Sequence, residues 1–174
     1  MQKSAFSLFG LEPDLALDLV ALERVHRAMS AALHPDAAGA NAAFRLPRAQ
    51  QLAQLNAAYK QLKDPVSRAE AVLAERGALL GDGNEPSPSP DLLMEVLEAR
   101  EALSEARRAK DVSACEAMLC TARQLHARTM EAMGAALAVG DLELAVRTLG
   151  ELRYHARLEK DALDTVALLE DEGL

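Results

Sequence analysis

Apolar residues recur every three or four positions along almost the whole of this 174-residue chain, and that period is typical of amphipathic helices. Near the N-terminus one helical face carries Leu15, Leu19, Leu22, His26, Met29 and Leu33. Pro35 ends this pattern, because the residue before a proline is pushed out of the helical region. A second face carries Leu52, Leu55, Tyr59 and Leu62, and a shorter pattern covers residues 66–76. The spacing predicts two antiparallel helices joined by a loop, with short flanking helices.

Composition excludes a sheet. The chain holds 35 Ala and 30 Leu, but only nine Val and four Thr, and it has no Ile and no Trp. Residues that suit a pleated surface are scarce, whereas those that lose little entropy in a helix dominate. We therefore expect an all-α fold, which excludes the dinucleotide-binding and barrel folds that host many enzymes.

Glycine and proline interrupt the helical period over residues 77–91. We interpret residues 77–90 as a linker between an N-terminal domain, residues 1–76, and a C-terminal domain, residues 91–174. The end of the linker also looks like a helix start, with Ser89 as the N-cap and Pro90 at the first helical position.

The C-terminal domain shows three longer helical patterns, over residues 90–110, 112–139 and 141–170. Only Lys110-Asp111 and Gly140-Asp141 separate them, and such short connections predict an antiparallel three-helix bundle. The predicted core stripes are Leu92, Val96, Ala99, Leu103 and Ala106; then Met118, Ala122, Leu125 and Met133; then Ala145, Leu149, Leu152, Ala156, Leu163 and Val166.

Several classes of protein are excluded by charge and hydropathy. Charges interrupt every apolar stretch, so we expect no membrane span. We also expect the protein not to be exported, because no long apolar segment precedes Glu12 and Asp14. The net charge of −8 argues against binding nucleic acid. Residues 1–76 sum to +1 and residues 77–174 to −9, so the two parts differ in surface potential. Cys115 and Cys120 are interpreted as reduced structural thiols of a cytoplasmic protein.

No group of residues suited to catalysis is apparent. His34 and Asp36 lie two residues apart across a proline, and no third group orients the imidazole. The four histidines show no spacing that would gather metal ligands on one helical face, and no glycine-rich phosphate loop follows a strand. We therefore expect no enzyme activity, no cofactor and no metal.

The tripeptide His34-Pro35-Asp36 stands out at the end of the first long helix. It follows Phe-Ser-Leu-Phe-Gly-Leu at residues 6–11 and precedes Leu-Asn-Ala-Ala-Tyr-Lys-Gln-Leu-Lys-Asp-Pro at residues 55–65. Together these segments resemble a J-domain. Arg-Ala-Glu-Ala-Val-Leu at residues 68–73, the segment 92–103 and Glu-Leu-Arg-Tyr at residues 151–154 narrow the resemblance to the HscB family, the J-type co-chaperones of iron-sulfur cluster assembly.

The resemblance implies two partners and no catalysis by the chain itself. In such a protein the J-domain engages the heat-shock-70 chaperone HscA through His34, Pro35 and Asp36 and stimulates its ATPase. The C-terminal bundle would hold the iron-sulfur scaffold protein IscU. The family's basic face on the first long helix carries over to Arg24 and Arg27. Ala31, Ala32, Leu33 and Ala37 stand where many J-domains have basic or aromatic residues, so electrostatic steering should be weaker here.

Helical phase also predicts a partner face on the bundle. Leu93, Leu97 and Met94 lie roughly 100°, 140° and 200° from the Leu92 stripe, so they are surplus to the core. Tyr154 lies about 200° from Leu152, and we expect it to stack on Leu158 away from the core. A wider bundle core could instead absorb these residues. With the family resemblance, the predicted scaffold-binding residues are Leu93, Met94, Leu97, Glu98, Arg100, Glu101, Glu105 and Tyr154.

Two other functions remain open at this point. The chain could be a J-domain co-chaperone for a different client, or a plain helical adaptor in which the tripeptide only stops a helix. A role for Cys115 and Cys120 as iron or cluster ligands is a weaker alternative.

Overall fold

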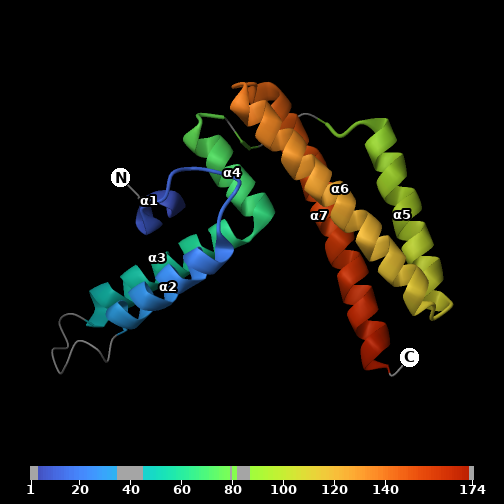
Figure 1. Cartoon of the computed structure of the whole chain (residues 1–174), viewed down its shortest axis with the longest axis horizontal. Helices are drawn as coiled ribbons and strands as arrows, with labels where there is room; N and C mark the ends of the chain where they lie inside the picture. The colour runs from blue at the N-terminus through green and yellow to red at the C-terminus, as the bar shows by residue number, and fades with distance from the viewer. Residues whose placement is uncertain (1–3, 35–44, 79, 82–86, 173–174) are drawn as a thin grey trace. The chain divides into compact units, whose positions relative to one another are not determined.

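The computed structural model describes residues 4–34, 45–78, 80–81 and 87–172, and within these ranges every regular element is an α-helix. Figure 1 shows α1 (Ala5–Phe9), α2 (Leu19–Leu33), α3 (Arg45–Lys63), α4 (Pro65–Glu75), α5 (Pro90–Arg108), α6 (Val112–Ala138) and α7 (Leu142–Asp171). The predicted all-α fold is confirmed. No described helix combines the length and the apolar character that a bilayer span requires. The chain divides into two units, Met1–Gly77 and Ala78–Leu174.

The N-terminal unit is built on an antiparallel hairpin of α2 and α3, which lie side by side in Figure 1. The short helix α1 packs on this hairpin, and α4 packs against α3. The largest fully buried side chains of the unit are Phe6 from α1, Leu62 from α3, and Leu73 and Val72 from α4. Leu22 of α2 is also buried, so each helix contributes an apolar face to a shared core.

Helix α2 begins one turn later than the apolar stripe suggests. The Asp18 side chain accepts hydrogen bonds from the backbone N–H groups of Val20 and Ala21, at 2.9 Å each, and so caps the helix at Leu19. Leu15 belongs to the preceding segment and is nevertheless buried. The spacing correctly marked Leu15 as a core residue but wrongly placed it in the helix.

The corner between α3 and α4 is fixed by two polar groups. The Asp64 side chain accepts from the backbone N–H of Ser67 at 2.7 Å, with Pro65 in the first turn of α4. The buried Arg68 donates from Nη1 to the carbonyl oxygen of Leu62, at 2.7 Å. This bond satisfies a carbonyl at the end of α3 that no intrahelical donor can reach.

The C-terminal unit is a bundle in which α6 and α7 form a long antiparallel hairpin and α5 packs against both, as predicted (Figure 1). Both turns use the same device. Lys110 and Gly140 adopt left-handed conformations, with φ of 56° and 76°. Asp111 and Asp141 then cap the next helices through hydrogen bonds of 2.9 Å. At the start of α5, the Ser89 hydroxyl accepts from the Leu92 N–H at 3.1 Å, which confirms the predicted cap.

The core stripe of α7 differs from the prediction in its second half. The buried residues are Ala145, Thr148, Leu149, Leu152, His155, Leu158, Ala162, Thr165, Val166 and Leu169. The prediction used Ala156 in place of His155, which shifted the stripe by one residue and selected Leu163. Leu163 is 44% exposed, whereas Leu158 is only 4% exposed. The expectation that Leu158 lies away from the core, stacked with Tyr154, is therefore wrong.

Replacing Leu149 by Ala should lower the free energy of unfolding by about 2–5 kcal/mol, because the side chain is fully buried and its loss leaves a cavity. The matched control Leu163→Ala should cost under about 1 kcal/mol, since that leucine faces solvent. Urea unfolding followed by circular dichroism measures both. Equal losses for the two variants would contradict the corrected stripe.

Candidate functional site

The predicted chaperone-binding tripeptide begins at the C-terminal end of α2. His34 is the C-cap residue, and its backbone N–H donates to the carbonyl oxygen of Ala31 at 3.4 Å. Its φ and ψ of −58° and 133° take the chain out of the helix, which is the conformation favoured before a proline. The residue as a whole is exposed. Pro35 and Asp36 lie outside the described residues, so the role of the tripeptide stays a prediction.

The predicted basic face of α2 carries Arg24 and Arg27, and both residues are exposed. Arg27 forms an ion pair with Glu23 one turn earlier, and the Arg27 side chain remains 77% exposed. Exposed pairs of this kind contribute little to stability, so Arg27 can exchange Glu23 for another carboxylate at little cost. The two arginines are accessible, and their contact with a chaperone stays a prediction.

A stacked pair holds the middle of the hairpin together behind these arginines. The His26 and Tyr59 rings lie nearly parallel, with their centroids 4.1 Å apart. His26 Nε2 also lies 2.8 Å from the side-chain oxygen of Asn56 on α3. His26 is half-buried, as expected from its position on the apolar face of this helix, and it serves to fix α2 against α3.

On the bundle, α5 divides into a packing face and an open face. Leu92, Val96 and Leu103 are buried against α6 and α7. Leu93, Met94 and Leu97 are 44%, 55% and 51% exposed. The wider core considered as an alternative therefore does not absorb them. Glu98, Glu101 and Glu105 are exposed beside these three residues. Among the described residues, α5 thus presents an apolar strip with an acidic border.

Arg100 and Tyr154 lie together at the contact between α5 and α7. Arg100 Nη2 lies 3.1 Å from a carboxylate oxygen of Asp161 on α7. Tyr154 is half-buried on α7, and both residues line one recess of about 680 Å³. The structure brings these two predicted residues into one place, while the glutamates of α5 are absent from the lining of this recess.

Sequence reasoning missed other residues that line the same recess. They are Ser87, Pro88, Ser89, Arg147, Gly150, Glu151, Arg153 and Arg157. A signal was present, because Arg147, Gly150, Tyr154 and Arg157 recur at spacings of three and four and so share a face of α7. Of the residues on that face, the prediction assigned only Tyr154 to the scaffold-binding site.

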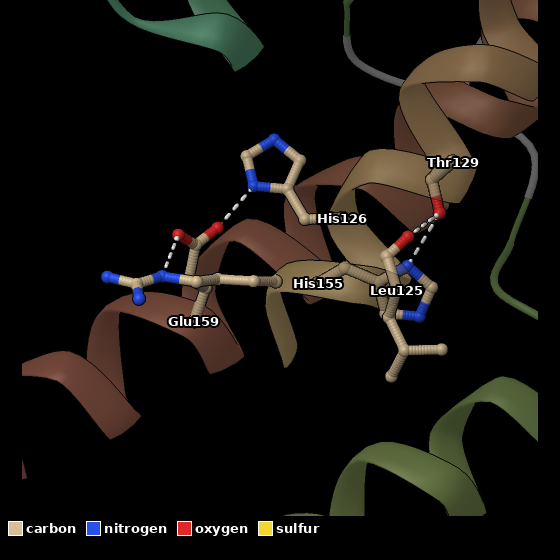
Figure 2. A network of polar contacts seen from close by, with 6 residues as sticks. Leu125, His126, Thr129, His155 and Glu159 are labelled. Carbon is tan, nitrogen blue, oxygen red and sulfur yellow. Dashed lines mark hydrogen bonds and ion pairs between the residues drawn. The ribbon is translucent and has the colours of Figure 1, made fainter. Parts of the chain in front are cut away.

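A polar network joins α6 to α7 (Figure 2). The Thr129 hydroxyl donates to the carbonyl oxygen of Leu125 at 2.9 Å, so it accepts from Nδ1 of the buried His155 at 2.8 Å. His126 Nδ1 lies 2.5 Å from the carboxylate of Glu159, and Arg123 approaches that carboxylate at 3.5 Å. Polar side chains of α6 therefore contact His155 and Glu159 on α7.

His155 is held neutral by this arrangement. Its Nε2 atom is buried and has no hydrogen-bond partner among the described residues. Burial lowers the pKa of His155 from its ordinary value of 6.5, and this effect exceeds the opposing influence of Glu95 and Glu151. A proton on Nε2 would place an unpaired charge between the helices.

Neither cysteine belongs to a ligand cluster. Cys115 is fully buried, and burial raises the pKa of its thiol, whereas Cys120 is exposed. The described parts of the chain hold no group of three His, Cys, Asp or Glu side chains that could bind a metal ion.

Comparisons with known proteins agree on one family. The family model described as the HSCB C-terminal oligomerisation domain matches residues 88–162. Two relatives named co-chaperone protein HscB homolog, from Cupriavidus taiwanensis and Burkholderia multivorans, are 35% and 32% identical over 95% and 98% of this chain and of their own lengths. The solved chaperone HscB from Vibrio cholerae is 31% identical, with a TM-score of 0.81 over 99% of this chain and all of its own. Human co-chaperone protein HscB, 21% identical with a TM-score of 0.80 over 92% of this chain and 80% of its own, shares the fold.

Acidification should destabilise the C-terminal unit through His155. The unfolded chain takes up a proton near pH 6.5 that the folded state resists, so the stabilisation is complete above that pH and is lost as the pH falls below it. Urea unfolding followed by circular dichroism at pH 7.5 and 5.5 measures the loss. His155→Gln should show a smaller loss than the wild type, while His34→Gln, at an exposed position, should show the same loss. An unchanged pH dependence in His155→Gln would contradict this assignment.

Proposed function

This chain belongs to the HscB family of co-chaperones, and on that premise we propose that it delivers the iron-sulfur scaffold protein IscU to the heat-shock-70 chaperone HscA. The observation that carries the proposal is the apolar strip of Leu93, Met94 and Leu97. These large side chains remain exposed on a bundle whose core is otherwise filled by leucines of 0% exposure, such as Leu149 and Leu152. Leaving such residues in water is unfavourable unless a partner covers them.

The N-terminal part, residues 1–76, acts as the J-domain in this proposal. His34, Pro35 and Asp36 engage the ATP-bound chaperone, and Arg24 and Arg27 approach its acidic surface. The exposure of His34 and of both arginines supports this assignment. The tripeptide can accelerate hydrolysis only by binding one conformation of the chaperone better than the other. The chain itself catalyses no reaction.

The C-terminal domain, residues 91–174, binds the scaffold in this proposal. Leu93, Met94 and Leu97 supply the apolar contact, and Tyr154 adds an aromatic ring from α7. The polar border consists of Glu98, Arg100, Glu101 and Glu105. Aromatic and arginine side chains beside an apolar centre are typical of protein–protein interfaces.

The linker, residues 77–90, joins the two activities on one chain. A scaffold protein held by the bundle is then present at the chaperone at a high effective concentration. This effect does not require the scaffold and the chaperone to bind each other directly. We assign the work to the cytoplasm, where the exposed Cys120 thiol would stay reduced.

Replacing His34 by Gln should abolish the stimulation of HscA ATPase activity and leave scaffold binding unchanged, because His34 is distant in sequence from the apolar strip and makes its proposed contact with the chaperone. The measurement is ATP turnover by HscA with IscU and with purified wild-type or variant protein. His155→Gln serves as the matched control and should stimulate like the wild type at pH 7.5.

Two outcomes would contradict this part of the proposal. If the wild-type protein gives no stimulation, the chain is not a co-chaperone of HscA. If His34→Gln stimulates as well as the wild type, the tripeptide is only a helix stop, as in the adaptor alternative.

Replacing Leu93 and Leu97 together by Ala should weaken IscU binding by about tenfold or more, because two exposed anchors at the centre of the interface are lost. Isothermal calorimetry measures the affinity, and the melting temperature should stay within a few degrees of the wild type. A matched control, Leu163→Ala with Leu168→Ala, removes two leucines of similar exposure, 44% and 39%, from α7.

The control variant should bind IscU like the wild type. Equal weakening in both double variants would show that the strip on α5 has no special role. If IscU does not bind the wild-type protein at all, the client is a different protein.

A further inference from the structure

A recess lies beside the apolar strip in the C-terminal unit. It has a volume of about 680 Å³ and lies where α5, α7 and residues 87–89 meet. Its lining residues are Ser87, Pro88, Ser89, Arg100, Arg147, Gly150, Glu151, Arg153, Tyr154 and Arg157. A hollow of this size accommodates several side chains of a partner protein.

The lining is strongly basic in a domain that is otherwise acidic. Four arginines face a single glutamate, although residues 77–174 sum to a charge of −9. Arg100 pairs with Asp161 at 3.1 Å, Arg147 pairs with Glu143 at 3.6 Å, and Arg153 is not free either, but the Arg100 and Arg147 side chains stay at least 40% exposed. Exposed pairs are weak, so these arginines can still attract carboxylates from outside. Arg100 Nε is buried and has no hydrogen-bond partner among the described residues.

Gly150 helps to keep the recess hollow. It lies inside α7, where glycine costs about 1 kcal/mol relative to alanine. A Cβ atom built at this position meets nothing within 4 Å, so open space lies over the backbone. A larger residue here would project into the recess that Gly150 lines.

The recess and the acidic border lie on opposite sides of Leu93 and Leu97, the two strip residues nearest to Arg100 around α5. At 100° per residue, Arg100 is about 20° from Leu93 around α5, on the side that meets α7. Glu101, Glu105 and Glu98 lie roughly 80–140° from Leu93 in the other direction. Arg100 also follows Leu97 by three residues, so the two side chains are neighbours on the helix surface. Leu93 and Leu97 are therefore bordered by glutamates on one side and by arginines on the other, while Met94, about 100° from Leu93, lies among the glutamates.

We propose that this arginine-lined recess binds acidic side chains of the scaffold protein while the apolar strip holds its hydrophobic surface. The inference rests on the proposed function and adds an orientation to it. A partner with carboxylates on one edge and basic groups on the other fits in only one direction, because turning it round would bring like charges together. Bidentate pairing with guanidinium groups suits carboxylates in particular.

The test reverses charge in the recess without touching the residues proposed above as scaffold contacts. Arg147→Glu with Arg157→Glu should weaken IscU binding by about tenfold or more in calorimetry at low salt, and the loss should shrink as salt is raised. The matched control is Arg128→Glu with Lys160→Glu. Both control residues are exposed, both lie outside the lining of the recess, and the pair changes the net charge by the same amount. The control should change the affinity by less than about threefold.

Each outcome bears on the proposal. A loss confined to the recess variant supports it. Equal losses in the two variants would mean that only overall charge matters, and no loss in the recess variant would mean that the recess is not used; either result overturns it. If the wild-type protein fails to bind IscU, the proposed function fails first and this inference fails with it.

A second pair of variants guards against misfolding caused by the charge reversals. Gly150→Leu fills the recess without changing charge, and it should weaken IscU binding by about tenfold. Gly134→Leu on α6 is its control, because a Cβ atom there also meets nothing within 4 Å. Unchanged affinity in Gly150→Leu, with a wild-type melting temperature, would overturn the inference.

Discussion

The contact between α6 and α7 is the interaction on which the C-terminal unit depends. α7 supplies a buried residue at almost every third or fourth position from Ala145 to Leu169, so one face is committed to the hairpin over its full length. α5 then packs on the hairpin with only Leu92, Val96 and Leu103 buried. Because three buried residues suffice to hold α5, the rest of its surface is free to present the apolar strip and its charged borders.

The burial of His155 shows which features of the fold could be predicted from the sequence and which could not. The number, order and approximate bounds of the helices could be predicted from the apolar spacing and from the positions of glycine and proline. These signals depend only on neighbouring residues in the sequence. The phase of the second half of α7 was predicted wrongly, because the predicted stripe passed through Ala156 instead of the adjacent His155. Burial of His155 is made possible by Thr129 on the partner helix, a contact made across 26 residues of sequence. The spacing of apolar residues within one helix cannot predict a contact with a residue on another helix.

The same limit applies to the candidate site. The exposure of Leu93, Met94 and Leu97 could be predicted, because α5 has a clear cap and a clear packing face. The arginine-lined recess could not, since it exists only where α7, α5 and residues 87–89 come together. The net charge of −9 over residues 77–174 gave no indication of a basic recess in this domain.

The burial of Cys115 has a consequence for a protein proposed to carry iron-sulfur cargo. Its sulfur is fully enclosed within a cluster that includes Leu119, Val166 and Leu169, and the raised pKa keeps the thiol protonated at neutral pH. Metal ions bind the thiolate form, so this cysteine does not compete with the cargo for iron. The bundle can thus include a small, well-packed sulfur side chain in its interior without creating a site that would strip metal from its own passenger.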